Sequence, residues 1–312
     1  MQRLLYILLL LFAVSQHAVS QTFAAEWMTC PEQTDTSCLW FRRTFVAAER
    51  PCRASVRVAS DSRFILYVNG RNVSTALYMP VCGDGASRTV AITFDVTRFL
   101  RPDSNTVALL ASPSLPRMAA PRVAVDFFGV TAGGCRFARS NVDGWLCRPA
   151  GARFASGGEL YDSRLDSLSS ACGDMALVQW VPAAQSAAVT APPADIGMSA
   201  ESVFGYNVHG CNVLADDAVR VAGIVGPQRR EVRGDTVVCD FAPGLCGFMR
   251  VTLRGCRRGE RIRIGGFTYV CSGYNDEQAF CRFSPQYFRS VAITGDCSFS
   301  PEQVQDVEAV CI

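Results

Sequence analysis

The chain has 312 residues, about twice the length of a common single domain, so two domains are the starting expectation. Apolar residues make up 49% and charged residues 19%, which excludes a disordered chain, and the net charge of +2 provides no field that would attract nucleic acid. All 30 basic residues are arginine, which excludes lysine chemistry, and two histidines leave little room for histidine-based triads or metal sites.

Residues 1–20 have the pattern of a secretory signal peptide. Arg3 precedes an apolar run from Leu4 to Val14, and the small residues Ala18-Val19-Ser20 resemble a cleavage site. The apolar run is shorter than the ~20 residues of a membrane-spanning helix, although a retained anchor is the alternative. We therefore expect a secreted, periplasmic or cell-surface protein with no transmembrane anchoring after cleavage.

Short runs of alternating apolar and β-branched residues follow, separated by Gly, Asn, Asp and Pro. In Arg63–Val68 the alternation puts Phe64, Leu66 and Val68 on one face, and Asn69-Gly70, a preferred hairpin pair, follows at once. No long stretch has helical periodicity. The sequence predicts an all-β fold of two antiparallel β-sandwiches of jelly-roll or galactose-binding-like type. Further expected strands cover 54–59, 89–94, 106–110, 123–128, 250–253, 261–264, 267–271 and 287–293.

A segment rich in Ala, Pro and Ser divides the chain. It contains Ala191-Pro192-Pro193, whose prolines fix an extended backbone and cannot donate to a sheet. We expect a first sandwich over 21–182, a linker over 183–217 and a second, smaller sandwich over 218–312.

Fifteen cysteines in an exported chain are typical of disulfides. Zinc would need closely spaced cysteine pairs in tandem, and the spacings here are wider and irregular. Connectivity does not follow from sequence, but we expect local pairs among Cys30 and Cys38, Cys135 and Cys147, Cys239 and Cys246, Cys271 and Cys281, and Cys297 and Cys311.

Four motifs in order resemble the opening β-sandwich domains of bacterial α-L-rhamnosidases. In the first half, WFRRTF (40–45) with ASVRVASDSRFILYVNGRNV (54–73) is similar to one family pattern, and GELYDSRL (158–165) is similar to "G-E-x-Y-D-A-R", with Asp143-Gly144-Trp145 ahead of it. In the second half, VCDFAPGLCGFMR (238–250) and RFSPQYFRSVAITG (282–295) are similar to two more.

The resemblance implies ancillary sandwiches that precede a helical (α/α) barrel, which carries the catalytic carboxylates in that family. The chain ends where such a barrel would begin, so the resemblance implies no catalytic residue here. Pro243-Gly244-Leu245-Cys246 and Ser284-Pro285-Gln286-Tyr287 replace polar family patterns, which puts contacts at those positions in doubt.

The first predicted hairpin offers a candidate sugar-binding site. Asp61, Arg63, Tyr67 and Asn69 surround it, and Tyr67 or Trp40 could stack on the apolar face of a sugar ring. The alternative is an ordinary turn with Tyr67 packed between strands. Trp145, Glu159, Asp162 and Arg164 of the family-like motifs complete the candidate carbohydrate-binding residues.

Glu159, Asp162 and Asp166 form the densest acidic cluster. A glycosidase needs two carboxylates within reach of one bond, and a turn could bring these close enough. The alternative is a turn in which the carboxylates accept backbone N–H groups and pair with Arg164.

We expect no metal and no cofactor: Asp84 and Asp216-Asp217 lack a calcium-loop pattern, and His209 is more typical of a structural residue. Three functions remain open: a carbohydrate-binding accessory protein for a glycan that could contain rhamnose, a glycosidase acting through Glu159 and Asp162, and a cell-envelope protein that binds a protein partner.

Overall fold

The computed structural model describes most of the chain after residue 24. The described residues are 25–32, 36–47, 49–74, 76–79, 90–114, 119–155, 158–166, 180–187, 194–199 and 219–312. Within them no helix is long and apolar enough to cross a membrane. The expectations for the signal peptide, Asp84, His209, Asp216 and Asp217 concern residues outside these ranges.

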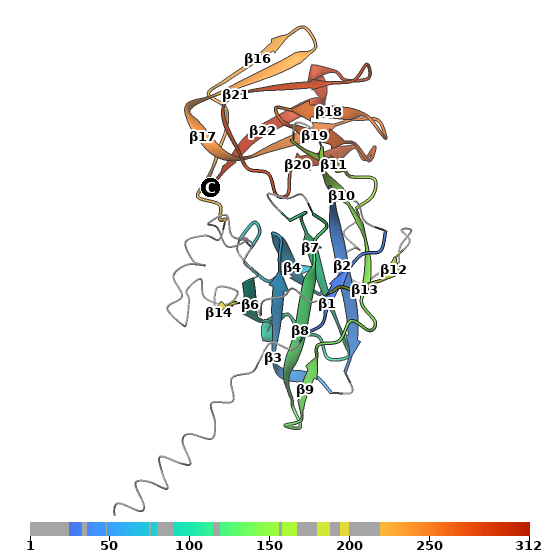
Figure 1. Cartoon of the computed structure of the whole chain (residues 1–312). Coiled ribbons are helices and arrows are strands. Elements are labelled where there is room, and N and C mark those ends of the chain that lie inside the picture. Colours follow the sequence, from blue (N-terminus) through green and yellow to red (C-terminus); the bar gives the residue numbers. More distant parts are fainter. Residues whose placement is uncertain are drawn as a thin grey trace, which may run out of the picture.

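The described part of the chain is built of strands, as the alternating pattern predicts (Figure 1). It contains no α-helix, and its short helical turns are η1 (Thr97–Phe99) and η3 (Pro301–Gln303). The predicted face of β4 (Phe64–Val68) is confirmed, because Phe64, Leu66 and Val68 enter one core while Ile65 enters another. The predicted hairpin turn is also found, with Asn69 and Gly70 at positive φ.

The first sheet closes one side of the N-terminal sandwich. Its order is β13-β1-β8-β3-β6-β14, with β9 added beside β8. The pairs are antiparallel except for β14 and β6, which run parallel. Its strands are β1 (Trp27–Thr29), β3 (Pro51–Ser60), β6 (Val90–Asp95), β8 (Val123–Thr131), β9 (Arg136–Arg139), β13 (Ala184–Gln185) and β14 (Ala194–Ser199).

The second sheet runs through both halves of the chain. Its main order is β15-β22-β17-β21-β18-β19-β11-β10-β2-β7-β4-β5, with β12 beside β10, and with β16 and β20 beside β17. The N-terminal part consists of β2 (Ser37–Val46), β4, β5 (Arg71–Asn72), β7 (Ser104–Ala111), β10 (Leu146–Ala155), β11 (Gly158–Asp162) and β12 (Val181–Pro182). The C-terminal part consists of β15 (Gly223–Val225), β16 (Arg229–Arg233), β17 (Thr236–Arg254), β18 (Arg261–Ile264), β19 (Phe267–Val270), β20 (Asp276–Phe280), β21 (Gln286–Gly295) and β22 (Val304–Cys311).

Strand β11 joins the two halves. On one edge it pairs antiparallel with β10, and on the other it pairs in parallel with β19, matching Tyr161 to Tyr269. Gly158 permits this approach: its φ is +142°, and a Cβ there would lie 1.8 Å from the carbonyl oxygen of Gly266. Figure 1 shows β11 passing from the lower sandwich to the strands of the C-terminal half.

Two large hydrophobic cores follow from this layout. The first lies between the two sheets and contains Phe41, Phe94 and Trp145. The second fills the C-terminal half around Phe248 and extends to Trp40 on the outer face of β2. Each fully buried side chain of this size contributes about 1.5–3 kcal/mol relative to exposure, so the shared second core holds the halves together.

The segment expected to link the sandwiches also contributes strands. Within 183–217, β13 pairs with β1 and β14 pairs with β6, so the connector extends both ends of the first sheet. The expected boundaries at 182 and 217 stay predictions.

The expected local cysteine pairs stay predictions, and the structure shows where their members lie. The twelve described cysteines are free thiols, and the thiol partner of Cys30 is Cys147. Cys38, the expected partner, belongs to the second core, whereas Cys30 belongs to the first. Cys135 is exposed whereas Cys147 is fully buried.

Two further predicted pairs can be compared with the structure. Cys271 has Cys256, rather than Cys281, as its thiol neighbour. Cys239 is buried and Cys246 is exposed, although both lie on β17. For Cys297 and Cys311 the pairing stays a prediction.

Candidate functional site

A cavity of about 550 Å³ opens where β11 meets β19, between the two halves of the molecule. Strands β2, β4 and β11 contribute one side, and β19, β20 and the loop between them contribute the other. The chain forms this site only after long-range pairing, because no single segment supplies both walls.

Aromatic rings form the walls. Trp40 and Tyr67 lie 5.6 Å apart between ring centroids, tilted by 44°, and Tyr161 stacks on Tyr269 at 5.9 Å and 29°. Burial raises the pKa of Tyr67, Tyr161 and Tyr269 above the ordinary value of 10, so their hydroxyls are protonated at neutral pH. These rings offer apolar surface with hydroxyl groups at its edge.

Glu277 shapes the loop at the cavity mouth. Its carboxylate accepts a hydrogen bond from the Tyr269 hydroxyl at 2.9 Å and from the backbone N–H groups of Ser272, Gly273 and Tyr274 at 2.8–3.1 Å. Glu277 is only 6% exposed, whereas the Tyr274 side chain is 74% exposed. The buried carboxylate therefore fixes a loop that holds an exposed aromatic ring at the rim.

Asp166 is the second ordered carboxylate of the cavity. One oxygen accepts the Trp40 Nε1–H at 3.0 Å and an Arg148 N–H at 2.9 Å, and the other accepts the Gly151 N–H at 3.0 Å. Asp166 therefore fixes the indole of Trp40 in the wall.

Arg282 supplies positive charge within the cavity. Its guanidinium carbon lies 4.9 Å from the centroid of the Tyr161 ring, and a guanidinium nitrogen lies 3.4 Å from the Tyr161 hydroxyl. Gln278 adds an exposed amide nearby on β20. Arginine and glutamine donate several hydrogen bonds each, which suits a ligand that carries many hydroxyl oxygens.

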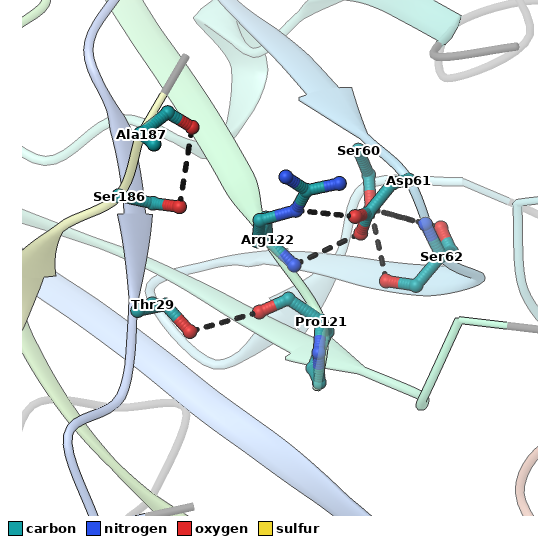
Figure 2. Close-up of polar contacts among 8 residues, drawn as sticks. All are labelled: Thr29, Ser60, Asp61, Ser62, Pro121, Arg122, Ser186 and Ala187. Atoms are coloured by element: carbon teal, nitrogen blue, oxygen red, sulfur yellow. Dashed lines mark hydrogen bonds and ion pairs between the residues drawn. The ribbon is translucent and has the colours of Figure 1, made fainter. Parts of the chain in front are cut away.

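Of the sequence-predicted residues, Tyr67 lies in this cavity, and Trp40, named as a possible stacking face, lies beside it. Asp61 does not reach it. Figure 2 shows Asp61 bound to Arg122, through the backbone N–H at 2.9 Å and Nε at 2.8 Å. The same figure shows Ser60 and Ser62 hydrogen-bonded beside it, as expected of a tightly bonded turn.

Arg63 and Asn69 have contacts within the fold. Arg63 donates to the Phe283 carbonyl at 2.7 Å, which connects the two halves. The Asn69 amide nitrogen donates to Asn105 at 2.9 Å and its oxygen accepts the Thr106 N–H at 2.9 Å, so the side chain fastens the hairpin.

The other candidates are buried or paired. Trp145 is 2% exposed in the first core and cannot stack on an external ring. Glu159 is 1% exposed and accepts the backbone N–H groups of Arg282 at 2.6 Å and Phe283 at 2.9 Å. Asp162 binds Arg164 at 2.7–2.8 Å, and this contact lowers the pKa of Asp162.

Sequence reasoning missed Tyr161, Tyr269, Tyr274, Glu277 and Arg282 as members of one site. Tyr161 stands inside the GELYD motif, and Arg282 begins the RFSP motif, so both lay beside noted residues. Their convergence depends on the parallel pairing of β11 with β19, which has no local signal in the sequence.

No group of three or more His, Cys, Asp or Glu side chains that could hold a metal ion occurs among the described residues.

No protein-family description matches the chain, and no characterised protein matches it in sequence. Three solved structures match its fold. They are the α-L-rhamnosidase of "Dictyoglumus thermophilum" (TM-score 0.74, 18% identity), that of Aspergillus terreus (0.70, 14%) and that of Streptomyces avermitilis, complexed with L-rhamnose (0.68, 17%). The alignments cover 94%, 92% and 88% of this chain.

The chain shares their fold. It spans only 36%, 36% and 28% of the lengths of those rhamnosidase chains, about a third of each. At these identities the likeness concerns architecture alone, so function has to be argued from the cavity.

Proposed function

We propose that the protein is an exported, non-catalytic carbohydrate-binding protein and that the cavity between its halves is the binding site. The observation that carries this proposal is that two aromatic pairs, Arg282 and Gln278 converge on one cavity, whose volume is about 550 Å³. This volume lies within the ~300–1,000 Å³ of ordinary small-molecule sites and suits one or two sugar rings.

The chemistry of a sugar matches the lining. A pyranose ring has a face of C–H groups that packs on an aromatic ring, and hydroxyls at its edge that need fixed donors and acceptors. Tyr274 at the rim can cover the C–H face, and Arg282 and Gln278 can bind ring hydroxyls. The lining holds Arg282 together with the carboxylates of Asp166, Asp276 and Glu277, and this mixture of charges favours a neutral saccharide over a strongly anionic one.

Binding without hydrolysis is supported by the state of the carboxylates. Glycoside hydrolysis needs one carboxyl group to protonate the leaving oxygen and a second to attack or activate water. Asp166 and Glu277 have both oxygens engaged by donors of the protein, and Glu159 is enclosed by backbone N–H groups. We expect no release of nitrophenol from aryl glycosides between pH 4 and 8, and turnover lost in Glu159→Gln would instead support a glycosidase.

Rhamnose is the first sugar to test. One structure that shares the fold is complexed with L-rhamnose, although the likeness extends to architecture alone. Titration calorimetry with L-rhamnose, rhamnose-containing oligosaccharides and a panel of other neutral sugars would identify the preferred ligand. Absence of heat for every sugar at millimolar concentration would contradict the proposal.

The exposed tyrosine at the rim gives a sharp test of the site. Tyr274→Ala is expected to weaken sugar binding about fivefold, because it removes one stacking surface worth about 1 kcal/mol. Tyr287→Ala is the matched control: Tyr287 is 75% exposed on β21 and does not line the cavity. Equal affinity in both variants would place the ligand elsewhere.

A further inference from the structure

Cys30 and Cys147 form a buried thiol pair between distant parts of the chain. Both are 0% exposed in the first core, and their side chains are hydrogen-bonded to each other. The strands explain why they meet. Cys147 pairs with Val181 in β12, and Thr29, the residue before Cys30, pairs with Ala184 in β13. The short segment between β12 and β13 thus brings the end of β1 to the start of β10.

Cys256 and Cys271 form a second buried pair in the C-terminal half. Cys256 is 6% exposed, Cys271 is 0% exposed, and their thiols are also hydrogen-bonded to each other. The turn before β18 folds over the end of β19, because the Gly259 N–H donates to the Cys271 carbonyl at 2.8 Å and the Cys271 N–H donates to the Glu260 carbonyl at 2.9 Å. These bonds bring Cys256 next to Cys271.

We propose that the exported protein contains two disulfides, Cys30–Cys147 and Cys256–Cys271. Each forms when two thiols lose two protons and two electrons to an oxidant of the disulfide class, such as an oxidised thiol-disulfide oxidoreductase, which becomes a dithiol. A thiol contact inside a packed core already holds the two sulfurs close, so the bond needs little backbone movement. An oxidising compartment is where such pairs persist.

The ionisation of Cys30 favours disulfide formation in the first pair, Cys30 and Cys147. A hydrogen bond from the Cys147 thiol lowers the pKa of Cys30 to about 7 and raises the pKa of Cys147. A thiolate is the form that attacks a disulfide, and Cys30 is the thiol of the pair whose ionisation this contact favours.

The second disulfide also anchors the proposed sugar site. Cys271 directly precedes Ser272–Tyr274, the loop that Glu277 holds at the cavity mouth. A bond to Cys256 would fix the base of this loop. This consequence rests on the proposed sugar site, whereas the disulfides themselves rest only on the proposed export.

Peptide mapping of the protein secreted from an oxidising host tests the proposal. Thiols are blocked with N-ethylmaleimide in denaturant without reductant, and the chain is cleaved by trypsin after arginine. Peptide 140–153 contains Cys147 as its single cysteine, and peptide 255–257 contains Cys256. We expect 140–153 linked to the peptide that ends at Arg42, and 255–257 linked to 264–282.

Two control variants resolve the remaining ambiguity. The peptide that ends at Arg42 holds both Cys30 and Cys38, and peptide 264–282 holds both Cys271 and Cys281. Cys38→Ala and Cys281→Ala should keep both links, whereas Cys30→Ala and Cys271→Ala should each abolish one. Maleimide on Cys147 and Cys256 in the wild-type protein, or links of these residues to Cys135 or Cys281, would overturn the proposal. Mapping requires no sugar binding, so its result is independent of the proposed sugar site.

Discussion

At the scale of single residues, three acidic side chains that are close in sequence have separate structural roles. Glu159 binds backbone N–H groups of the C-terminal half, Asp162 pairs with Arg164, and Asp166 fixes Trp40. The sequence predicted the turn and the Arg164 partner, because short-range contacts follow from spacing. It could not predict the partners of Glu159, which lie more than a hundred residues away.

The buried pair of Asp166 with Arg148 allows a quantitative prediction. Both side chains are at most 7% exposed, and the oxygen–nitrogen distance is 2.9 Å. Asp166→Asn removes the negative charge that faces this nearly buried guanidinium, so the free energy of unfolding should fall by about 3–5 kcal/mol. Urea denaturation followed by tryptophan fluorescence measures this change.

The control for that variant is a solvent-exposed ion pair. Glu231 contacts Arg229 and Arg233 at 2.8–3.1 Å, and all three side chains are at least a third exposed. Water and salt screen such pairs, so Glu231→Gln should leave the urea midpoint unchanged. Equal effects of the two variants would mean that Asp166 is not enclosed as described.

At the scale of elements, β11 decides how the molecule is assembled. Strand positions were predictable because two-residue alternation is a local signal, and β4, β8 and β18 lie where the pattern placed them. The parallel pairing of β11 with β19 was not predictable, because the two strands lie far apart in the sequence. Each of them also had many other strands as possible partners.

Gly158 tests the importance of this pairing. Gly158→Ala places a methyl group against the Gly266 carbonyl, so β11 and β19 should separate and the free energy of unfolding should fall by about 3 kcal/mol. Sugar binding should weaken with it, because the cavity lies at the same junction.

Gly223 provides the control for the Gly158→Ala variant. It lies on β15, and a Cβ there would meet no atom within 4 Å. Gly223→Ala is expected to change the free energy of unfolding by less than about 0.5 kcal/mol. If Gly158→Ala were equally harmless, the close approach of β11 to β19 would be refuted.

At the scale of the whole molecule, the continuous second sheet and the shared second core make the junction a structural unit. The all-β class was predictable from composition and alternation, whereas the cavity arises from the contact between halves. One of the two aromatic pairs, Trp40 with Tyr67, was therefore visible in advance, while the pair of Tyr161 with Tyr269 was not.

The same reasoning applies to the cysteines. Their number pointed to disulfides, but proximity in sequence suggested local pairs, and the fold brings Cys30 to Cys147 and Cys256 to Cys271. Sheet strands carry alternate residues to opposite faces, so neighbours along the chain are often separated by a sheet.

The most direct test of sugar binding is a crystal structure of the protein soaked with the saccharide that binds best in solution. We predict a sugar ring between Tyr274 and the Trp40–Tyr67 pair, with its hydroxyls within hydrogen-bonding distance of Arg282 and Gln278. A sugar bound instead in the separate cavity lined by Arg43 and Phe137, with the junction cavity empty, would contradict the account.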